Sequence, residues 1–545
     1  MVPTPSSPPT PESTRAALAD WRGRVGSDWL ADDPHVRSLA PEFPELRRFA
    51  ARCAGEVDAL ARNTNRDEHL PRLQRYDADG RRTENVVFHP DHHRIGEAVW
   101  AADVLGRYRS PGQELQTLSL IYLLAQNGEG GWCCPLACTA GMIKVCQRAT
   151  DLPAPWLQGL LSPRYADMLH ASQFLTELQG GSDVGANVLS ASPAVDAPGW
   201  WKLTGEKWFC SVIDARLFLV TARPVGAPVG TAGLRAFVVP RALPGLDLLD
   251  PASTPNQYMV RRLKWKLGTR SMASAEVDFE GAYGWPVADF QQTVETVLNT
   301  SRLYNAICAS GMLQRAWREA DAWARTRLAF GSPILAFPSV ARTLARLQCE
   351  AWASRSLTFD LAAMADRIAL GSAGPTEPTA WRMLVNLNKI WTALTCPAGV
   401  RDAIEIVGGN GAIEEFSVLP RLLRDSLVIE AWEGGHGVLC AQLLRDAKKG
   451  LHRPMFAYLE QRVGVAGAAA TQGLAALWDQ TLSRKDAAVV WRDLVEQSRP
   501  IIQAALLRAQ GAPDAIVRHY AALHDPSLNP LTDPDLEDRI RAVIG

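Results

Sequence analysis

The stretch FLTELQGGSDVGAN, residues 174–187, places two adjacent glycines beside an acid, a serine and a threonine. It separates an apolar run from the tryptophan-rich GWWKLTGEKWFCSV, residues 199–212. Glycines let main-chain N–H groups approach a ligand closely, and Thr176 and Ser182 offer short hydroxyl donors. Such a loop suits a phosphate or the polar edge of a ring. The alternative interpretation is a solvated connection into a strand.

Hydrophobic periodicity divides the rest of the chain into helical and β-rich blocks. Helical patterns such as TLSLIYLLAQ, residues 117–126, dominate the N-terminal part and are interrupted by the loop-like RYDADGRRTENVVFHPDHH, residues 75–93. Short β-rich runs follow, and long helical patterns then return. We predict an α+β fold with a disordered leader (1–15), an N-terminal α-helical domain (16–168), a central β-barrel or sandwich domain (169–288), an α-helical bundle (289–449) and a C-terminal helical extension (450–545).

Composition excludes several classes of protein. The chain has 545 residues, 47% of them hydrophobic, which is enough for several substantial cores. Its 57 Lys and Arg nearly balance 58 Asp and Glu, so no overall charge attracts a polyanion. The cysteines in GWCCPLACTAGMIKVC, residues 131–146, lack the paired spacing of a zinc site, and we expect no metal. The Pro/Ser/Thr-rich start lacks a signal-peptide core and no apolar run is long enough to span a membrane, which predicts a cytoplasmic protein.

Four further motifs suit a flat heterocycle joined to a diphosphate. GEKWFCS, residues 205–211, brings aromatic and hydroxyl side chains onto one predicted strand. RTRLAFGSPILAF, residues 325–337, offers the cation Arg327 and the ring of Phe330 at a helix end. EIVGGNGAIEE, residues 405–415, is a second glycine turn, and IEAWEGGHG, residues 429–437, sets Glu433 between a tryptophan and glycines. No G-x-G-x-x-G sequence follows a predicted strand and opens a helix, so the motifs do not indicate a Rossmann fold and another ligand has to be considered.

In this order, the motifs resemble those of the acyl-CoA dehydrogenase family of flavoproteins. LQRYDADGRRTENVVFHP, residues 73–90, and RLKWKLGTRSMASAEVDF, residues 262–279, are more typical of its AidB branch, the DNA alkylation response proteins. The chain length and the additional C-terminal helices favour the same branch. The resemblance extends over about residues 73–445 and implies an acyl-CoA dehydrogenase-like fold and a homotetramer.

The resemblance also implies a bound FAD and an acyl-CoA or similar small-molecule substrate. Glu433 matches the catalytic base, which removes the α-proton of the thioester while hydride leaves the β-carbon for the flavin. The alternative interpretation is that Glu433 pairs with an arginine or caps a helix. By motif position, the residues expected to contact the cofactor are Thr176, Gly181, Ser182, Phe209, Cys210, Ser211, Arg327, Phe330, Gly408, Gly409, Trp432 and Gly434.

Three positions depart from the family pattern. Gly435 lies where the family usually has Ser or Thr, Ala412 lies where an aromatic residue is common, and His436 follows the glycine pair. We expect Gly435 to remove one contact with the cofactor or the substrate and Ala412 to alter the shape of the cofactor turn. For His436 two interpretations stay open, a residue that tunes the site and an ordinary loop histidine.

A second function stays open, an AidB-like FAD protein that associates with double-stranded DNA and has weak dehydrogenase activity. Residues 445–518 of the C-terminal block carry 11 Lys and Arg against 7 Asp and Glu. A phosphate-binding stripe requires that the following residues share one surface: Arg484, Lys485, Arg492, Arg499 and Arg508. A solvated, charged helix is the alternative interpretation.

Overall fold

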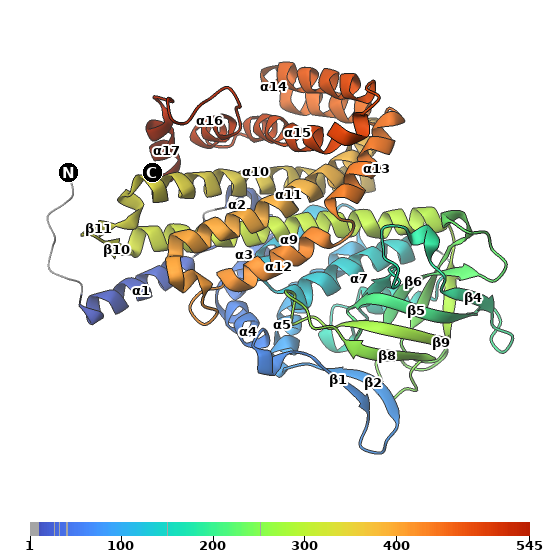
Figure 1. Cartoon of the computed structure of the whole chain (residues 1–545). Coiled ribbons are helices and arrows are strands. Elements are labelled where there is room, and N and C mark those ends of the chain that lie inside the picture. Colours follow the sequence, from blue (N-terminus) through green and yellow to red (C-terminus); the bar gives the residue numbers. More distant parts are fainter. Residues whose placement is uncertain (1–9, 27, 32, 40–41, 150, 251) are drawn as a thin grey trace. The chain divides into compact units, whose positions relative to one another are not determined.

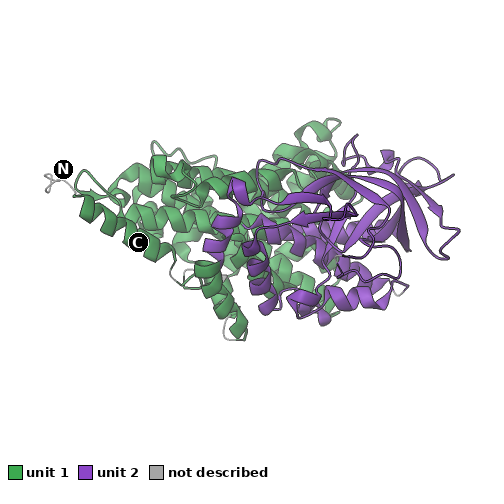
Figure 2. Cartoon of the chain, turned by 90° about the horizontal axis from the view of Figure 1, so that it is seen from below, with its two compact units in different colours: residues 1–56, 114–128, 305–545 green, residues 57–113, 129–304 purple. Residues whose placement is uncertain are grey.

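A computed structural model describes residues 10–545 except 27, 32, 40–41, 150 and 251 (Figure 1). The chain divides into two compact units (Figure 2). Unit 1 comprises residues 1–56, 114–128 and 305–545, and unit 2 comprises residues 57–113 and 129–304. Helix α9 (Phe290–Thr326) contributes residues to both units.

Unit 2 contains a seven-stranded sheet. Its strands are β3 (Ala171–Phe174), β4 (Ser190–Pro193), β5 (Trp201–Ser211), β6 (Leu217–Pro224), β7 (Arg235–Pro240), β8 (Tyr258–Leu263) and β9 (Ser274–Val287). The strands β6, β4, β5, β9 and β7 pair in that order, and β7 pairs again with β6. These pairings close the sheet into a barrel, which leaves its central strands without free edges.

The strand sequences explain the barrel. Residues 217–222 of β6 are all buried, as expected of a strand that is covered on both faces. In the core, the ring of Phe174 stacks on Phe218 with centroids 4.8 Å apart, and Tyr258 meets Phe218 edge-on at 5.6 Å. Phe174, the last residue of β3, is therefore packed into the core at the point where the loop 174–187 begins.

Unit 2 also contains helices and one hairpin. The helices are α4 (Asp58–Thr64), α5 (Pro90–Ala101), α7 (Gly130–Arg148) and α8 (Ala154–Leu160). The prediction of a loop over 75–93 was wrong, because β1 (Arg72–Tyr76) and β2 (Arg82–Val87) form an antiparallel hairpin there. Its turn is closed by Asp77 Oδ1, which accepts from the N–H groups of Asp79 and Arg81 at 2.9 and 2.8 Å.

Unit 1 is helical apart from the short strands β10 (Leu328–Ala329) and β11 (Ser332–Pro333) in its described part. Its N-terminal helices are α1 (Pro11–Val25), α2 (Pro34–Leu39), α3 (Pro44–Arg52) and α6 (Glu114–Ala125). The central helices are α10 (Pro338–Ala369), α11 (Glu377–Val407), α12 (Leu419–Ala431) and α13 (His436–Lys448), and the C-terminal helices are α14 (His452–Leu482), α15 (Ala487–Ala509), α16 (Asp514–Leu523) and α17 (Leu536–Ile544).

Among the described residues, apolar clusters pack the helices of unit 1 against one another. Trp21 of α1 stacks on Phe416 with centroids 5.1 Å apart, so α1 belongs to the folded unit. The predicted leader is therefore too long, since α1 begins at Pro11, and residues 1–9 lie outside the described residues. A second cluster packs Leu507, Ile516 and Tyr520 of the C-terminal helices against α10. The fold class is confirmed, whereas the boundaries at 168, 288 and 449 stay predictions.

Candidate active site

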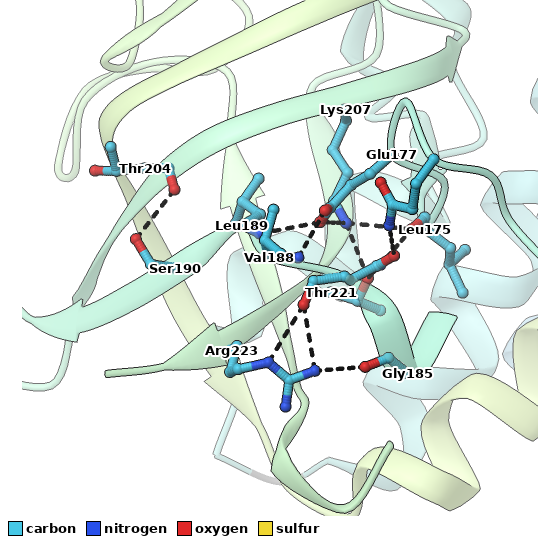
Figure 3. A network of polar contacts seen from close by, with 12 residues as sticks. Leu175, Glu177, Gly185, Val188, Leu189, Ser190, Thr204, Lys207, Thr221 and Arg223 are labelled. Carbon is cyan, nitrogen blue, oxygen red and sulfur yellow. Dashed lines mark hydrogen bonds and ion pairs between the residues drawn. The ribbon is translucent and has the colours of Figure 1, made fainter. Parts of the chain in front are cut away.

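The loop 174–187 is held at its base by a buried ion pair (Figure 3). Lys207 Nζ lies 2.9 Å from Glu177 Oε1, and both side chains are excluded from solvent. Glu177 also accepts hydrogen bonds from the N–H groups of Val188 and Leu189 at 2.7 and 3.1 Å. Burial lowers the pKa of Lys207, and the charge of Glu177 opposes this change. These contacts fix both ends of the loop on the barrel.

The glycine pair lies against the hydroxyl group of Thr176. A Cβ on Gly181 would lie 2.4 Å from Thr176 Oγ1, so a larger residue at this position would displace the hydroxyl. The preceding residue, Gly180, has φ +126°, a backbone conformation that is disfavoured for residues other than glycine. The carbonyl of Thr176 accepts from Trp208 N at 2.9 Å, which joins the loop to β5. Ser182 is exposed beyond this contact. The loop can therefore present hydroxyl and N–H donors to a ligand.

Strand β5 carries an irregularity beside this loop. Its register with β9 shifts between Lys207 and Cys210, at the position of Trp208 and Phe209. Lys264 Nζ lies 3.6 Å from the ring centroid of Trp208 and 4.9 Å from that of Phe209. The ring of Phe209 is 55% exposed, which is unusual for phenylalanine and leaves a flat apolar face available.

The next two residues of β5 differ in what they can offer. The side chain of Cys210 is fully buried, and burial raises the pKa of its thiol well above the usual value. Cys210 can therefore contribute only main-chain atoms to a ligand surface. Ser211 is half-buried, with its Oγ 3.2 Å from the Oγ of Ser274 on β9.

In unit 1, Arg327 directly follows α9. Its N–H donates to Trp323 O at 2.8 Å, and its exposed side chain has no ion pair among the described residues. Strands β10 and β11 then form a hairpin whose two turn residues, Phe330 and Gly331, have φ of 50° and 85°. The ring of Phe330 is 80% exposed at this turn. The exposed guanidinium of Arg327 and the exposed ring of Phe330 thus belong to one short segment at the end of α9.

The second glycine turn ends α11. Gly408 has φ +75°, and its N–H donates to Ile404 O. A Cβ on Gly411 would lie 2.9 Å from the same carbonyl oxygen, so this tight turn requires glycine at both positions. Gly408 and Gly409 are exposed, which leaves their main chain accessible to a ligand.

Glu433 lies in the turn between α12 and α13. It adopts φ +56°, which is rare for a residue other than glycine, and Gly434 follows with φ +101°. Trp432 packs against the apolar core of unit 1. Lys389 of α11, which is fully buried, donates to Glu430 O at 2.7 Å and to Gly434 O at 3.0 Å. The turn therefore has a fixed attachment on each side of Glu433.

The departures from the family pattern have different structural settings. His436 Nε2 lies 3.5 Å from Glu430 Oε2, and burial, together with the charge of Lys389, lowers the pKa of His436. A Cβ on Gly435 would meet no atom within 4 Å, so sterics do not require glycine there. Ala412 is exposed at the end of the Gly408 turn.

The predicted site residues fall into two sets, one in each unit (Figure 2). The set in unit 2 comprises Thr176, Gly181, Ser182, Phe209, Cys210 and Ser211, which the hydrogen bond between Thr176 and Trp208 brings together. The set in unit 1 comprises Arg327, Phe330, Gly408, Gly409, Trp432, Glu433 and Gly434, which lie at the ends of α9, α11 and α12.

Three charged residues near the candidate site were not predicted from the sequence. Glu177 and Lys207 fix the loop in unit 2, and Lys389 fixes the Glu433 turn in unit 1. Lys389 has a signal in the sequence, because it lies inside the apolar helical run MLVNLNKIWTAL, residues 383–394. A lysine in such a run must either reach solvent or bind buried acceptors.

The predicted basic stripe is not formed. Arg484 pairs with Asp486 at 2.7 Å, and Arg492 pairs with Glu496 at 2.8 Å. Arg499 and Arg508 are nine residues apart on α15, which is two and a half turns and places them on opposite sides of the helix. The condition for a phosphate-binding stripe, that these residues share one surface, is therefore not met by Arg499 and Arg508.

Arg499 lies instead in a polar cleft of about 790 Å³ between α10, α11 and α15. Its Nη1 pairs with Glu350 at 2.8 Å and donates to Thr395 Oγ1 at 2.9 Å. The charged residues that line the cleft are Arg346, Arg401, Arg492 and Arg499, with Glu350, Asp402, Glu405 and Glu496. Equal numbers of arginines and carboxylates give this cleft no attraction for a polyanion.

The described part of the chain contains neither a metal site nor a membrane-spanning helix. No group of three or more His, Cys, Asp and Glu side chains is arranged to hold a metal ion there. None of the helices in that part of the chain has the length and apolar character needed to cross a membrane.

Three family models match successive parts of the chain. They are the N-terminal domain of the adaptive response protein AidB over residues 29–167, the middle domain of acyl-CoA dehydrogenase over 172–282, and its C-terminal domain over 290–448. The AidB protein of Escherichia coli is 33% identical over 79% of this chain and 77% of its own length. Acyl-CoA dehydrogenase family member 11 of Caenorhabditis elegans is 27% identical over 90% of this chain and 81% of its own length.

Solved structures show the same fold. Caenorhabditis elegans ACDH-11 in complex with C11-CoA has a TM-score of 0.81 at 24% identity, covering 94% of each chain. An acyl-CoA dehydrogenase from Bacillus anthracis complexed with FAD has a TM-score of 0.62 at 17% identity, covering 99% of this chain and 86% of the other.

Proposed function

The chain belongs to the acyl-CoA dehydrogenase family of oxidoreductases, and from this premise we propose that it is an FAD-dependent, AidB-type enzyme that removes two hydrogens across the α,β bond of an acyl-CoA thioester. The observation that carries the proposal is the Glu433 turn. A glutamate at a helix end, in a strained conformation and held by a buried lysine, is suited to a fixed carboxylate base.

The residues present fit FAD. Gly181 approaches the Thr176 hydroxyl so closely that a Cβ there would displace it, and Phe209 presents a flat exposed ring beside that contact. In unit 1, Arg327 offers a guanidinium for a diphosphate, and the exposed Gly409 of the second glycine turn offers main-chain atoms to a ligand. When bound, FAD supplies the acceptor for the hydride that leaves the substrate β-carbon.

The protein's own step is the removal of the α-proton. Glu433 Oε takes this proton, and the carboxylate must be ionised to do so. The neighbouring Trp432 is partly buried against the apolar core of unit 1, which places an apolar side chain directly before Glu433. The substrates that we propose are acyl-CoA esters. The structure of the Caenorhabditis elegans relative in complex with C11-CoA supports this proposal.

The experiment that tests this function is an anaerobic titration of the yellow holoprotein with acyl-CoA esters of increasing chain length. Loss of flavin absorbance with at least one ester, together with formation of a trans-enoyl product, is the expected result. A protein that binds no FAD, or one that is reduced by none of the esters, contradicts the proposal.

The alternative is an AidB-like FAD protein that associates with double-stranded DNA and has weak dehydrogenase activity. Its support is the match of residues 29–167 to the N-terminal domain of AidB, an adaptive response protein. The neutralised arginines of α15 count against it, because phosphate binding requires unpaired cations. A homotetramer in the cytoplasm remains our expectation under both functions.

A further inference from the structure

Lys389 is a lysine placed where an apolar residue would be expected. It lies on α11 between Asn388 and Ile390, all three being buried, and its own side chain has no exposure. Placing an ammonium group in such surroundings is costly unless hydrogen-bond acceptors receive it. Two main-chain carbonyls, Glu430 O at 2.7 Å and Gly434 O at 3.0 Å, are its acceptors.

Both acceptors belong to the same turn, one before and one after Glu433. Glu430 lies in the last turn of α12, where the carbonyl groups form the negative end of the helix dipole and attract a cation. Gly434 directly precedes the residue that caps α13. Lys389 therefore connects the end of one helix to the beginning of the next across residues 431–433.

The conformation of Glu433 requires such a connection. A φ of +56° is disfavoured for glutamate and persists only where surrounding contacts determine it. Asn305 adds a third attachment, because its Nδ2 donates to Ile429 O at 2.9 Å. Without Lys389 the carbonyls of Glu430 and Gly434 would lose their shared donor, and the turn would be free to relax.

We propose that Lys389 is a positioning residue for the base: its ammonium group fixes the turn on both sides of Glu433 and so holds the carboxylate at one place for removal of the α-proton. The inference rests on the proposed function of Glu433. Lys389 itself acts through the main chain of the turn and does not exchange a proton with the substrate.

The test compares Lys389→Met with the matched control Asn388→Ala. Asn388 is the preceding residue, is equally buried, and donates to Thr358 Oγ1 on α10 at 2.9 Å. Its removal costs a buried hydrogen bond on the same helix without touching the Glu433 turn. Lys389→Gln provides a second variant with a shorter neutral donor, in case the methionine variant does not fold.

Three measurements are made on the FAD-loaded variants. The rate of anaerobic flavin reduction at saturating acyl-CoA should fall roughly 10²-fold in Lys389→Met, the loss expected when a reacting group is misplaced by about 1 Å. The dissociation constant for an acyl-CoA thioether, which cannot be oxidised in the same way, should not change. Amide hydrogen exchange over residues 431–437 should become faster in this variant and stay as in wild type in Asn388→Ala.

The outcomes separate this inference from the proposed function. If wild type is reduced and Lys389→Met is reduced at the same rate, Lys389 has no positioning role, although the function stands. If both lysine variants lose thioether binding in parallel with the rate, the role is structural and the inference is wrong. If no acyl-CoA reduces wild type, the proposed function and the role of Lys389 both fail.

Discussion

Lys207 Nζ and Glu177 Oε1 lie 2.9 Å apart in an ion pair with no solvent exposure, at the base of the loop that carries the first glycine pair. Each partner also has hydrogen bonds to the main chain, Lys207 to Leu175 O at 3.2 Å and Glu177 to the N–H groups of Val188 and Leu189. Such a pair is costly to break from one side, because the remaining charge stays buried.

We therefore expect Lys207→Met to lower the free energy of unfolding by about 3–5 kcal/mol. The control is Lys202→Met on the same strand, where an exposed pair with Asp196 at 2.9 Å should contribute about 1 kcal/mol or less. Thermal unfolding of wild type and of both variants, monitored by circular dichroism, measures the two losses of stability. Equal losses in the two variants would contradict the importance of the buried pair.

His92 predicts a pH dependence of stability. Its ring is buried between Phe88 and Trp132, at centroid distances of 4.1 and 4.9 Å, and burial lowers its pKa from 6.5 to about 3. Between these two values the unfolded chain binds a proton that the folded chain does not bind, so stability falls as the pH is lowered. From pH 6.5 to 4 the expected loss is about 3 kcal/mol.

His92→Phe keeps an aromatic ring in this stack and removes the titrating group. Its unfolding free energy should therefore decrease less than that of wild type between pH 6.5 and 4. Denaturant titrations at several pH values measure both curves. Parallel curves for the two proteins would show that the acid sensitivity arises elsewhere.

Arg327 and Arg325 allow a matched test of cofactor binding. Arg327 is exposed without an ion pair among the described residues, whereas Arg325 pairs with Asp321 at 2.9 Å. Arg327→Ala should weaken FAD binding by about 1.5–3 kcal/mol, since a charge-assisted contact to the diphosphate is lost. Arg325→Ala should retain FAD as wild type does. Flavin absorbance after gel filtration measures occupancy, and full occupancy in Arg327→Ala would exclude Arg327 from the site.

Much of the fold could be predicted because the signals were local. Glycine at 181, 408 and 411 marks turns that the structure confirms as too close for a Cβ or as left-handed. The short β-rich runs that follow the N-terminal helical patterns correspond to the strands of the barrel, the first of which, β3, begins at Ala171. Both features depend on only a few consecutive residues.

Contacts between distant residues could not be predicted in this way. Lys389 and Gly434 are 45 residues apart, and Lys207 and Glu177 are 30 residues apart. The basic stripe failed for a similar reason, because Glu350 on α10 neutralises Arg499 on α15 across 149 residues. A count of charges along one segment does not include partners that the fold brings from another.

Of the five basic residues considered for DNA binding, two remain available to phosphate. Among the described residues, Lys485 and Arg508 have no ion pair, whereas Arg499 supports the fold through Glu350. We expect the protein to bind random duplex DNA weakly at low salt and not at 150 mM, measured by fluorescence anisotropy, because few cations are available to phosphate. Tight binding at that salt concentration, reduced by Lys485→Glu with Arg508→Glu, would instead favour the DNA-associated function.

Glu433→Gln separates a working dehydrogenase from an inherited fold. The amide is nearly isosteric with the carboxylate, and the attachments of the turn are to the main chain of Glu430 and Gly434, so folding and FAD content should not change. The proton step should fail, because the amide cannot accept the α-proton. Flavin reduction by a competent acyl-CoA should slow by at least the roughly 10²–10⁴-fold that a positioned general base contributes.

The control variant is Glu430→Gln. Glu430 is a half-buried glutamate in the last turn of α12, and its side chain lies 3.5 Å from that of His436. Normal reduction in Glu433→Gln and slow reduction in Glu430→Gln would assign the base to Glu430 instead.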